Sequence, residues 1–513
     1  MFKNAKHIVS TGTCLKRLIS SKTSPPDASV HLVFQGTSEG NPTIAHKLWA
    51  TACTSGSSKP LDSRLLFRDN SILSIVNLGD SLSWEKMTSD KRRETVRKAV
   101  GSAVGKIKDV ATSSGVRSIR FEVSGDKVDA QAAAVGARLG LHSFTLKTDP
   151  SSNPGKDIVV VPSDETNTGN WNIGTVYAEA QILARELVEL PANMMTPTLF
   201  CDRITKEAEG IDNIKVIIRD EAWAKENGMH AFLSVTKGTA EPAKLLEIHY
   251  KGSKSHPDEQ PLAFVGKGVT FDSGGISLKP GSGMKLMRGD MGGAASVCAA
   301  ILGIARLHIP INMVAVVPLC ENMPGSAASK PGDIVRAMNG KTIEIDNTDA
   351  EGRLILADAL YYASKEFKPH TIIDVATLTG AMMIALGNVY SGVFSTSDSL
   401  WDELHISGTH EHDRFWRMPL DDEFSPQITG SNADLCNNGG RSGGSCTAAL
   451  FLKSFVSGVD KTDEFKTRWA HIDIAGSMDT DRPLPYQYKG MTGRPTRALI
   501  EFARRHAERS KAP

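Results

Sequence analysis

Long apolar runs, paired cysteines and an excess of one charge are all missing from this chain. No apolar run approaches the roughly 20 residues that span a bilayer, and the run from Ile311 to Cys320 is better explained as a buried strand. The seven cysteines are scattered and form no C-x-x-C pair, which argues against a disulfide framework and a thiolate zinc site. The net charge of +1 gives no reason to expect binding to nucleic acid or to an anionic membrane.

Acidic residues are missing from Met1 to Pro26, a segment that holds five lysine and arginine residues among many serines and threonines. Basic, serine-rich, acid-poor segments are typical of organelle transit peptides, and this one lacks the unbroken apolar core of a secretory signal. We therefore expect residues 1–28 to be a mitochondrial transit peptide. The alternative is a disordered basic tail on a cytoplasmic protein.

The chain has 513 residues, 40% of them hydrophobic and 23% charged, which fits a globular protein of two or three domains. Short strands alternate with helices in residues 29–172, which predicts a smaller N-terminal α/β domain. The expected strands are His31 to Gln35, Leu73 to Leu78, Ser118 to Val123 and Asp157 to Val161; the helices are Asp90 to Val110, with Ser89 as N-cap, and Asp129 to Leu139.

The polar segment from Ser163 to Gly174 is predicted as a linker, and a helix from Thr175 to Leu190 follows it. In residues 173–513 the strands become more continuously apolar, with long helices between them. This pattern predicts a larger C-terminal domain with a central, mostly parallel sheet flanked by helices. The strands are Leu262 to Val265, Ile311 to Val317 and Thr371 to Val375; the helices include Gly292 to Leu307 and Leu354 to Lys365.

The octapeptide from Asn347 to Leu354, NTDAEGRL, places two carboxylates and one guanidinium at alternate positions. In an extended segment alternate side chains share a face, whereas on a helix residues two apart do not. We therefore expect Asp349, Glu351 and Arg353 to converge at the end of a strand. The carboxylates suit divalent metal ions and the guanidinium suits a planar anion; a solvated ion-pair cluster is the alternative.

A second group of charged residues follows the strand that ends at Val265. A phosphate-binding loop would need serine or threonine after the lysine of GKG, and the dinucleotide fingerprint fails at Phe271. Together with the acids of the octapeptide, the group instead supplies the parts of a two-metal hydrolytic centre. In such a centre at least one carboxylate bridges the two metal ions. A lysine can ligate only when neutral, and two dications would depress its pKa. The group consists of Lys267, Asp272, Lys279 and Asp290.

These blocks resemble the leucyl aminopeptidase (cytosol aminopeptidase) family of two-metal exopeptidases. NTDAEGRL is identical to that family's signature octapeptide. Similar blocks are GKGVTFDSGGISLKP, MRGDMGGAA, DVATLTGA, GGRSGGSCTAALFL and WAHIDIAG. The resemblance runs from about Thr175 to the C-terminus and is loose before it. It implies a metal-dependent aminopeptidase that releases N-terminal amino acids, preferentially leucine-like ones, from peptides.

The resemblance also implies two metal sites. Lys267, Asp272, Asp290 and Glu351 would form the tighter one. Asp272, Asp349, through its side chain and backbone carbonyl, and Glu351 would form the more exchangeable one. Asp272 and Glu351 belong to both sites and would therefore bridge the two metal ions. Zn²⁺ is the family's usual metal, with Mn²⁺ or Mg²⁺ often accepted at the second site, and the oxygen-rich ligand set allows all three.

By the same resemblance, a hydroxide bridging the metals would attack the first peptide carbonyl. Lys279 would stabilise the oxyanion, and Arg353 would hold a bicarbonate that takes the proton of the water. The side-chain pocket would be lined by Met287, Thr377, Leu378, Gly380 and Ala475.

One position departs from the family. Where the family usually reads Met-Asp-Leu-Met, this chain has Met284-Lys285-Leu286-Met287. Lys285 reverses a charge near the pocket without removing a ligand, so we expect it to alter side-chain preference or to weaken activity.

The resemblance implies a homohexamer, a dimer of trimers. A structural or scaffold protein that retains the fold with weak or no activity is the alternative function. DNA binding, known for some bacterial relatives, is disfavoured by the near-neutral charge and the lack of a basic recognition helix. Three further histidines, His405, His410 and His412, are expected on an exposed helix face.

Overall fold

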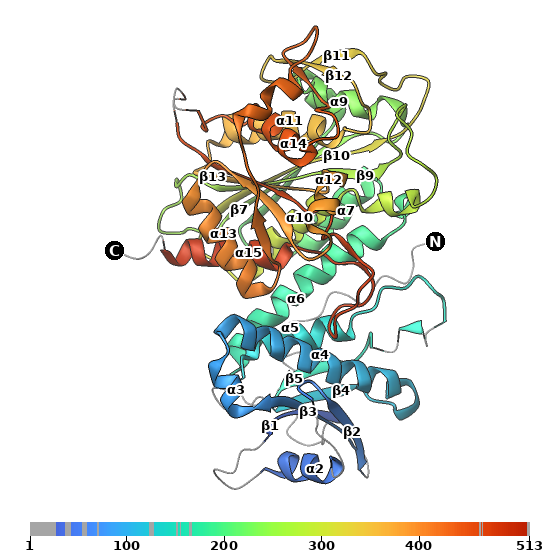
Figure 1. Ribbon diagram of the computed structural model, residues 1–513, viewed down its shortest axis with the longest axis vertical. Helices are drawn as coiled ribbons and strands as arrows, with labels where there is room; N and C mark the ends of the chain where they lie inside the picture. Colours follow the sequence, from blue (N-terminus) through green and yellow to red (C-terminus); the bar gives the residue numbers. More distant parts are fainter. Residues whose placement is uncertain are drawn as a thin grey trace.

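The computed structural model describes residues 27–35, 43–53, 59–68, 71–122, 128–149, 152–153, 155–163, 167–460, 463 and 465–509. The expected transit peptide at 1–28 lies outside these residues except for its last two, so it stays a prediction. Two sheets, each with its own helices, follow one another along the long axis of the molecule (Figure 1). The α/β fold class is confirmed.

Within the described residues, the N-terminal sheet has five strands in the order β2-β3-β1-β4-β5. All its pairs are parallel except β2 with β3. Helices α4 and α5 cover one face and α2 covers the other (Figure 1). The strands are β1 (Ala28–Gln35), β2 (Ser63–Arg68), β3 (Ser71–Asp80), β4 (Ser118–Glu122) and β5 (Val159–Pro162); the helices are α2 (Ile44–Ala52), α3 (Ser81–Lys86), α4 (Ser89–Ser114) and α5 (Ala130–Leu141).

Two caps explain where the helices of this sheet begin. The Thr88 side chain, not that of Ser89, caps α4 by accepting from the backbone N–H of Lys91. Asp129 caps α5 by accepting from the N–H of Ala132. The sequence pattern therefore located both helices and misplaced the first cap by one residue.

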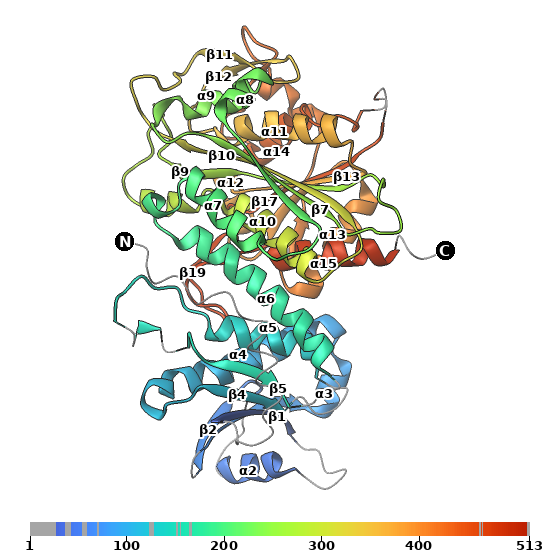
Figure 2. The same ribbon diagram turned by 180° about the vertical axis from the view of Figure 1, so that it is seen from behind.

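The predicted linker is wrong over its second half, because helix α6 (Thr168–Glu189) already begins at Thr168. Trp171 is buried in the core of the N-terminal sheet. A Cβ on Gly174 would lie 2.3 Å from the carbonyl oxygen of Gln131, so α6 packs closely on α5. This packing outweighs the low helix propensity of glycine and asparagine. As Figure 2 shows, α6 then runs on to the larger sheet.

Within the described residues, the larger sheet has nine strands in the order β15-β14-β17-β13-β8-β10-β7-β6, with β9 also paired to β10. The central strands β17, β13, β8 and β10 are parallel, and antiparallel pairs occur toward both edges. The mostly parallel sheet is thus confirmed. The strands are β6 (Ile214–Arg219), β7 (Lys244–Lys251), β8 (Leu262–Gly266), β9 (Gly268–Asp272), β10 (Asn312–Asn322), β13 (Thr371–Ala376), β14 (Ser391–Ser395), β15 (Phe415–Arg417) and β17 (Arg468–Asp473).

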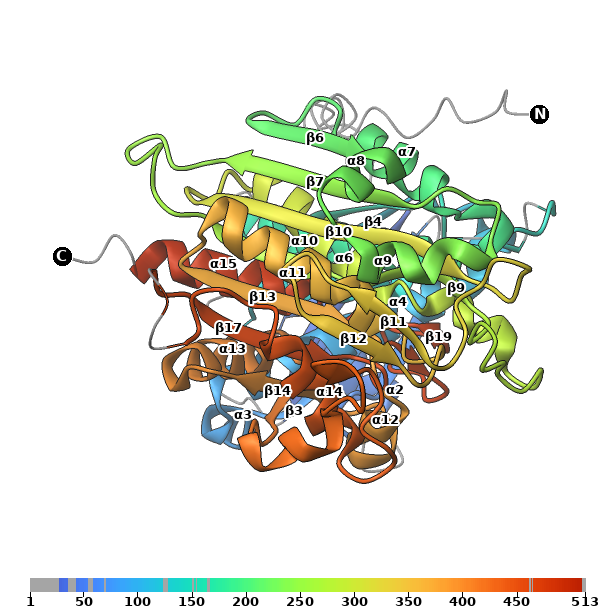
Figure 3. The same cartoon turned by 90° about the horizontal axis from the view of Figure 1, so that it is seen from above.

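Helices cover both faces of this sheet (Figure 3). Leu262 and Phe264 of β8 join one core, and Ala263 and Val265 join the other, which explains the uninterrupted apolar run in the sequence. One face carries α6, α7 (Pro197–Ala208), α10 (Gly292–Arg306), α13 (Asp398–Glu411) and α15 (Thr496–Arg509); the other carries α8 (Glu221–Glu226), α9 (His230–Val235), α11 (Gly352–Phe367) and α14 (Gly444–Lys453).

Smaller elements complete the C-terminal part. No helix of the described residues is long and apolar enough to cross a membrane. The smaller elements include α12 (Gly380–Leu386), β11 (Asp333–Arg336), β12 (Thr342–Ile345), β16 (Leu435–Cys436), β18 (Asp479–Thr480) and β19 (Gly490–Met491), with β11, β12 and β16 forming one small sheet.

The end of α13 joins the two parts of the molecule, which corrects the expectation for two of its histidines. His405 is exposed, but His410 and His412 are partly buried against α4. Buried Glu411 pairs at 2.9–3.0 Å with Arg93 and Arg97 of α4 and with Arg497 of α15. His410, Glu411 and Glu501 come close enough to share an ion, but the surrounding arginines already compensate these carboxylates.

Candidate metal centre

The charged residues singled out in the sequence meet at the carboxyl ends of the parallel strands. Lys267 lies between β8 and β9, and Asp272 is the last residue of β9. Asp290 separates the 3₁₀ helix η5 (Met284–Gly289) from α10, and Glu351 directly precedes α11. Parallel strands end at one edge of a sheet, which is why residues far apart in sequence gather there.

The expected extended conformation of the octapeptide is wrong. Thr348 and Asp349 form a turn, Glu351 has helical dihedral angles (φ −77°, ψ −35°), and Arg353 belongs to the first turn of α11. Glu351 nevertheless lies close enough to both Asp349 and Arg353 for their charges to interact. The residues converge because a tight turn leads straight into a helix, and not because alternate strand residues share a face.

Two lysines each join a pair of carboxylates. Lys267 Nζ lies 2.8 Å from Asp290 Oδ2 and 2.8 Å from Glu351 Oε1. Lys279 Nζ lies 2.8 Å from Asp272 Oδ2 and also pairs with Asp349. Ligand atoms of Asp272, Asp290 and Glu351 all fall within 4.8 Å of one another. All seven predicted ligand and catalytic residues are therefore within one site or, for Arg353, directly beside it.

Close packing holds Lys267 in place. A Cβ on Gly352 would lie 2.5 Å from Lys267 Cε, and a Cβ on Gly293 would lie 2.0 Å from the carbonyl oxygen of Val375. The Lys267 ammonium also donates to the carbonyl of Thr377 at 2.9 Å. Glycine is therefore required where α10 and α11 begin, because their backbones approach β13 and the lysine side chain so closely.

Neutral side chains orient the acids. The Thr377 hydroxyl donates to Asp290 Oδ1 at 2.7 Å. Asp272 Oδ1 accepts from Asn322 Nδ2 at 2.8 Å and from the N–H of Gly274 at 2.8 Å. Asp272 therefore has one oxygen held by neutral donors and the other turned to Lys279, whereas Asp290 Oδ1 accepts from both Thr377 and Lys267.

The electrostatics of the site favour bound cations. Four carboxylates and two ammonium groups leave an excess of negative charge. Burial and the neighbouring Glu351 raise the pKa of Asp272 to about 7, and burial raises the pKa of Asp290 well above its ordinary value. Burial would lower the pKa of Lys267, but Asp290 and Glu351 outweigh it and raise that pKa. Divalent ions would relieve the repulsion, and carboxylate oxygens with one amine suit Zn²⁺, Mn²⁺ or Mg²⁺.

Arg353 is a buried cation, and two of its nitrogens have no acceptor in the described part of the chain. Its side chain lies over the Phe451 ring, 6.0 Å from the centroid, and the residue is 8% exposed. Among the described residues, none accepts a hydrogen bond from its Nε or Nη1. Burial lowers its pKa to about 10, although Glu351 and Asp473 oppose the shift. Because an unpaired buried donor is costly, this guanidinium is a ready anion site.

Asp473, which the sequence reasoning missed, gathers part of the expected pocket. Its Oδ1 accepts from the backbone N–H of Leu378 at 3.3 Å and of Ala475 at 3.1 Å. Its Oδ2 accepts from the Thr379 hydroxyl at 2.7 Å. The segments after β13 and β17 are thereby held together at one side of the metal centre, next to Thr377.

The other expected pocket residues lie on two nearby elements. Gly380 is the first residue of α12. Met287 is in η5, and its carbonyl accepts from the N–H of Asp290 at 3.2 Å. Lys285 is exposed on the same element, and its backbone carbonyl accepts from Arg288. No sequence pattern pointed to Met478. Its sulfur and the Thr377 methyl each lie 3.3 Å from the position that a Cβ on Gly292 would take, so both side chains lie against the start of α10.

Known proteins match this chain in sequence and in overall fold. The model of the cytosol aminopeptidase family, catalytic domain, matches residues 182–500. The chain belongs to the cytosol aminopeptidase family. It is 49% identical to the cytosol aminopeptidase of Xenopus tropicalis over 82% of this chain and 78% of that protein. It is 47% identical to that of Homo sapiens over 86% of this chain and 82% of that protein.

Solved structures agree with the family assignment. The bottromycin maturation enzyme BotP in complex with Mn superposes with a TM-score of 0.80 and 31% identity, covering 94% of this chain and 100% of that one. A mutant of tomato leucine aminopeptidase gives a TM-score of 0.78 and 30% identity, with 95% of each chain covered. The cytosol aminopeptidases are two-metal-dependent hydrolases, and this chain is accordingly a metal-dependent aminopeptidase of the leucyl aminopeptidase type.

Proposed function

We propose that Lys267, Asp272, Asp290, Asp349 and Glu351 hold two divalent ions and that the chain releases leucine-like residues from the N-termini of peptides. The buried group of Asp272, Asp290 and Glu351, with ligand atoms within 4.8 Å, carries the proposal. Zn²⁺ is the proposed ion of the tighter site, and Mn²⁺ or Mg²⁺ is proposed for the exchangeable one. The complex of BotP with Mn supports the acceptance of Mn²⁺.

When bound, two such ions lower the pKa of a water and polarise a peptide carbonyl. The chain supplies the charge that this chemistry needs. Burial would lower the pKa of Lys279, but Asp272 and Glu351 raise it, so its ammonium stays charged and can stabilise a developing oxyanion. Arg353 Nε and Nη1 have no acceptor among the described residues, which supports a bound bicarbonate that accepts the proton of the attacking water.

The residues gathered around Asp473 support the proposed leucine preference. Leu378, Ala475 and the methyl of Thr377 offer apolar surface, and Met287, Met478 and Gly380 come from adjacent elements. A medium-sized apolar side chain gains free energy from burial in such surroundings, whereas a charged one would lose hydration there. A panel of aminoacyl amides tests this preference, and faster cleavage of aspartyl or glutamyl amides would contradict it.

Two further expectations remain proposals. A homohexamer is supported by the family relationship and by Met383 and Ile384, which expose apolar side chains on α12 that an interface would bury. Light scattering of the purified chain tests the assembly. Mitochondrial import is supported by the acid-poor, basic segment from Met1 to Pro26, and imaging of a tagged chain tests it.

The decisive experiment compares Glu351→Ala with Glu366→Ala, which changes an exposed residue at the far end of α11. We expect the first variant to lose hydrolysis of leucine p-nitroanilide with its fold intact, and the second to match the parent. Unchanged activity in Glu351→Ala would refute the proposed site. If the parent chain itself retains almost no metal after purification with Zn²⁺ or Mn²⁺ and turns over no substrate, the scaffold alternative is correct.

A further inference from the structure

Asn437 makes four hydrogen bonds to the turn that carries Asp349. It follows β16 in the chain and is fully buried. Its Nδ2 donates to the carbonyls of Asn347 at 2.7 Å and Ala350 at 3.3 Å. Its Oδ1 accepts from the N–H groups of Asp346 at 2.9 Å and Asn347 at 3.2 Å. One amide therefore uses both donors and both lone pairs on residues 346–350, the turn at the start of the signature octapeptide.

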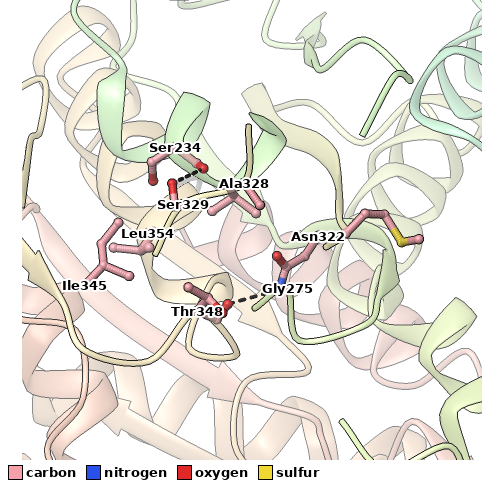
Figure 4. A pocket seen from close by; sticks show the side chains of 10 residues that line it. Ser234, Gly275, Asn322, Ala328, Ser329, Ile345, Thr348 and Leu354 are labelled. Atoms are coloured by element: carbon pink, nitrogen blue, oxygen red, sulfur yellow. Dashed lines mark hydrogen bonds between the residues drawn. The ribbon is translucent and has the colours of Figure 1, made fainter. Parts of the chain in front are cut away.

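Asn322 holds the same turn through a different carbonyl. Its Nδ2 donates to the carbonyl of Thr348 at 3.0 Å and to Asp272 Oδ1 at 2.8 Å. Figure 4 shows Asn322 and Thr348 side by side at the wall of a small pocket. The Thr348 hydroxyl further ties the turn to the glycine-rich loop by donating to the carbonyl of Gly274 at 2.7 Å.

Among the described residues 347–350, the two asparagines leave one backbone carbonyl without a donor. Those of Asn347, Thr348 and Ala350 each accept from an asparagine amide. Among the residues that the structure describes, no donor occupies the carbonyl of Asp349. Within residues 347–350, all of them described, the backbone oxygen without a donor thus belongs to a proposed metal ligand, and the turn cannot rotate it away without breaking several buried hydrogen bonds.

We propose that Asn437 is a positioning residue that fixes the Asp349 backbone for metal binding and so sets the affinity of the exchangeable metal site. The inference rests on the proposed function. In the part of the chain that the structure describes, the Asn437 side chain hydrogen-bonds to backbone groups and to none of the five proposed ligand side chains, so it acts through the backbone of the turn. Groups that orient metal ligands typically change metal affinity about 10- to 100-fold when replaced.

Asn437→Asp is the most discriminating variant. Aspartate keeps the shape of asparagine and the two hydrogen bonds that Oδ1 accepts, but it replaces the Nδ2 donor group with an oxygen that faces two carbonyls. Asn312→Asp is its matched control. Asn312 is also buried, and its Nδ2 donates to the carbonyls of His256 and Pro257 at 3.1 Å each. It stands at the first residue of β10, whereas Asn322, beside the site, is the last.

The experiment titrates metal-stripped protein with Mn²⁺, follows free Mn²⁺ by electron paramagnetic resonance, and records the melting temperature before addition. In Asn437→Asp we expect the weaker dissociation constant to rise about 10-fold or more and the tighter one to stay within about 3-fold, whereas Asn312→Asp changes neither. The two variants should melt at similar temperatures without metal. Asn437→Ser, which removes the donors without adding charge, replaces the aspartate variant if that protein does not fold.

Two outcomes overturn the inference: parental affinity at both sites in the Asn437 variants, or an equal loss at both sites. The failure of the proposed function looks different. In that case the parent chain binds fewer than two Mn²⁺ ions before any variant is compared.

Discussion

Thr377→Val should weaken the tighter metal site without unfolding the protein. Valine keeps the shape of threonine but removes the hydroxyl that donates to Asp290 Oδ1 at 2.7 Å, while the Thr377 carbonyl still accepts from Lys267. A hydrogen bond to a charged group contributes about 1.5–3 kcal/mol, and groups that orient a metal ligand typically change affinity about 10- to 100-fold. We therefore expect the tighter dissociation constant to rise at least about 10-fold.

Thr379→Val is the matched control, because its hydroxyl makes the same 2.7 Å bond to a buried aspartate, Asp473, which is not a proposed ligand. That hydroxyl also caps α12 through the N–H of Met382, so the control should lose slightly more stability, by about 1 kcal/mol. Melting temperatures of metal-free protein measure stability, and competition with a chromophoric chelator measures the metal affinity. Equal metal affinity in the two variants would refute the positioning of Asp290 by Thr377.

Three further predictions concern packing, the buried ion network and pH. Gly352→Ala places a Cβ 2.5 Å from Lys267 Cε, so we expect loss of peptidase activity and of metal binding in a folded protein; an active variant would show that the lysine can move freely. Glu411→Gln leaves three buried arginines undercompensated and should cost about 3–5 kcal/mol, measured as a lower melting temperature; an unchanged value would contradict this account of the network. Asp272 has a pKa of about 7 in the folded chain against 3.8 ordinarily, so the folded state holds its proton more tightly. The Asp272 contribution to the stability of metal-free protein is therefore largest near pH 4 and is lost up to about pH 7, so the difference in stability between the parent and Asp272→Asn should change over this range, whereas a constant difference would contradict the raised pKa.

Much of the fold could be predicted from the sequence, because the apolar runs that mark buried strands are local features of the chain. The apolar runs around Phe264, Val316 and Ile373 predicted buried parallel strands, and β8, β10 and β13 confirm them. The predicted linker failed because Trp171 and Gly174 pack against distant residues, which no local pattern records. The extended octapeptide failed for a related reason: alternation was taken as a strand period, although the segment is a turn held by Asn322 and Asn437.

By itself the sequence determined the kinds of chemistry present: the carboxylates, lysines and arginine of a two-metal peptidase, and the glycines beside them. Side-chain identity fixes which ions and charges a site can hold, and that information is carried by each residue alone. Only the tertiary structure decided which lysine faces which acids, which donors on Arg353 stay free, and which asparagines orient the turn. These depend on where separate strand ends meet, and hydrogen bonds between residues some 90 positions apart leave no local trace in the chain.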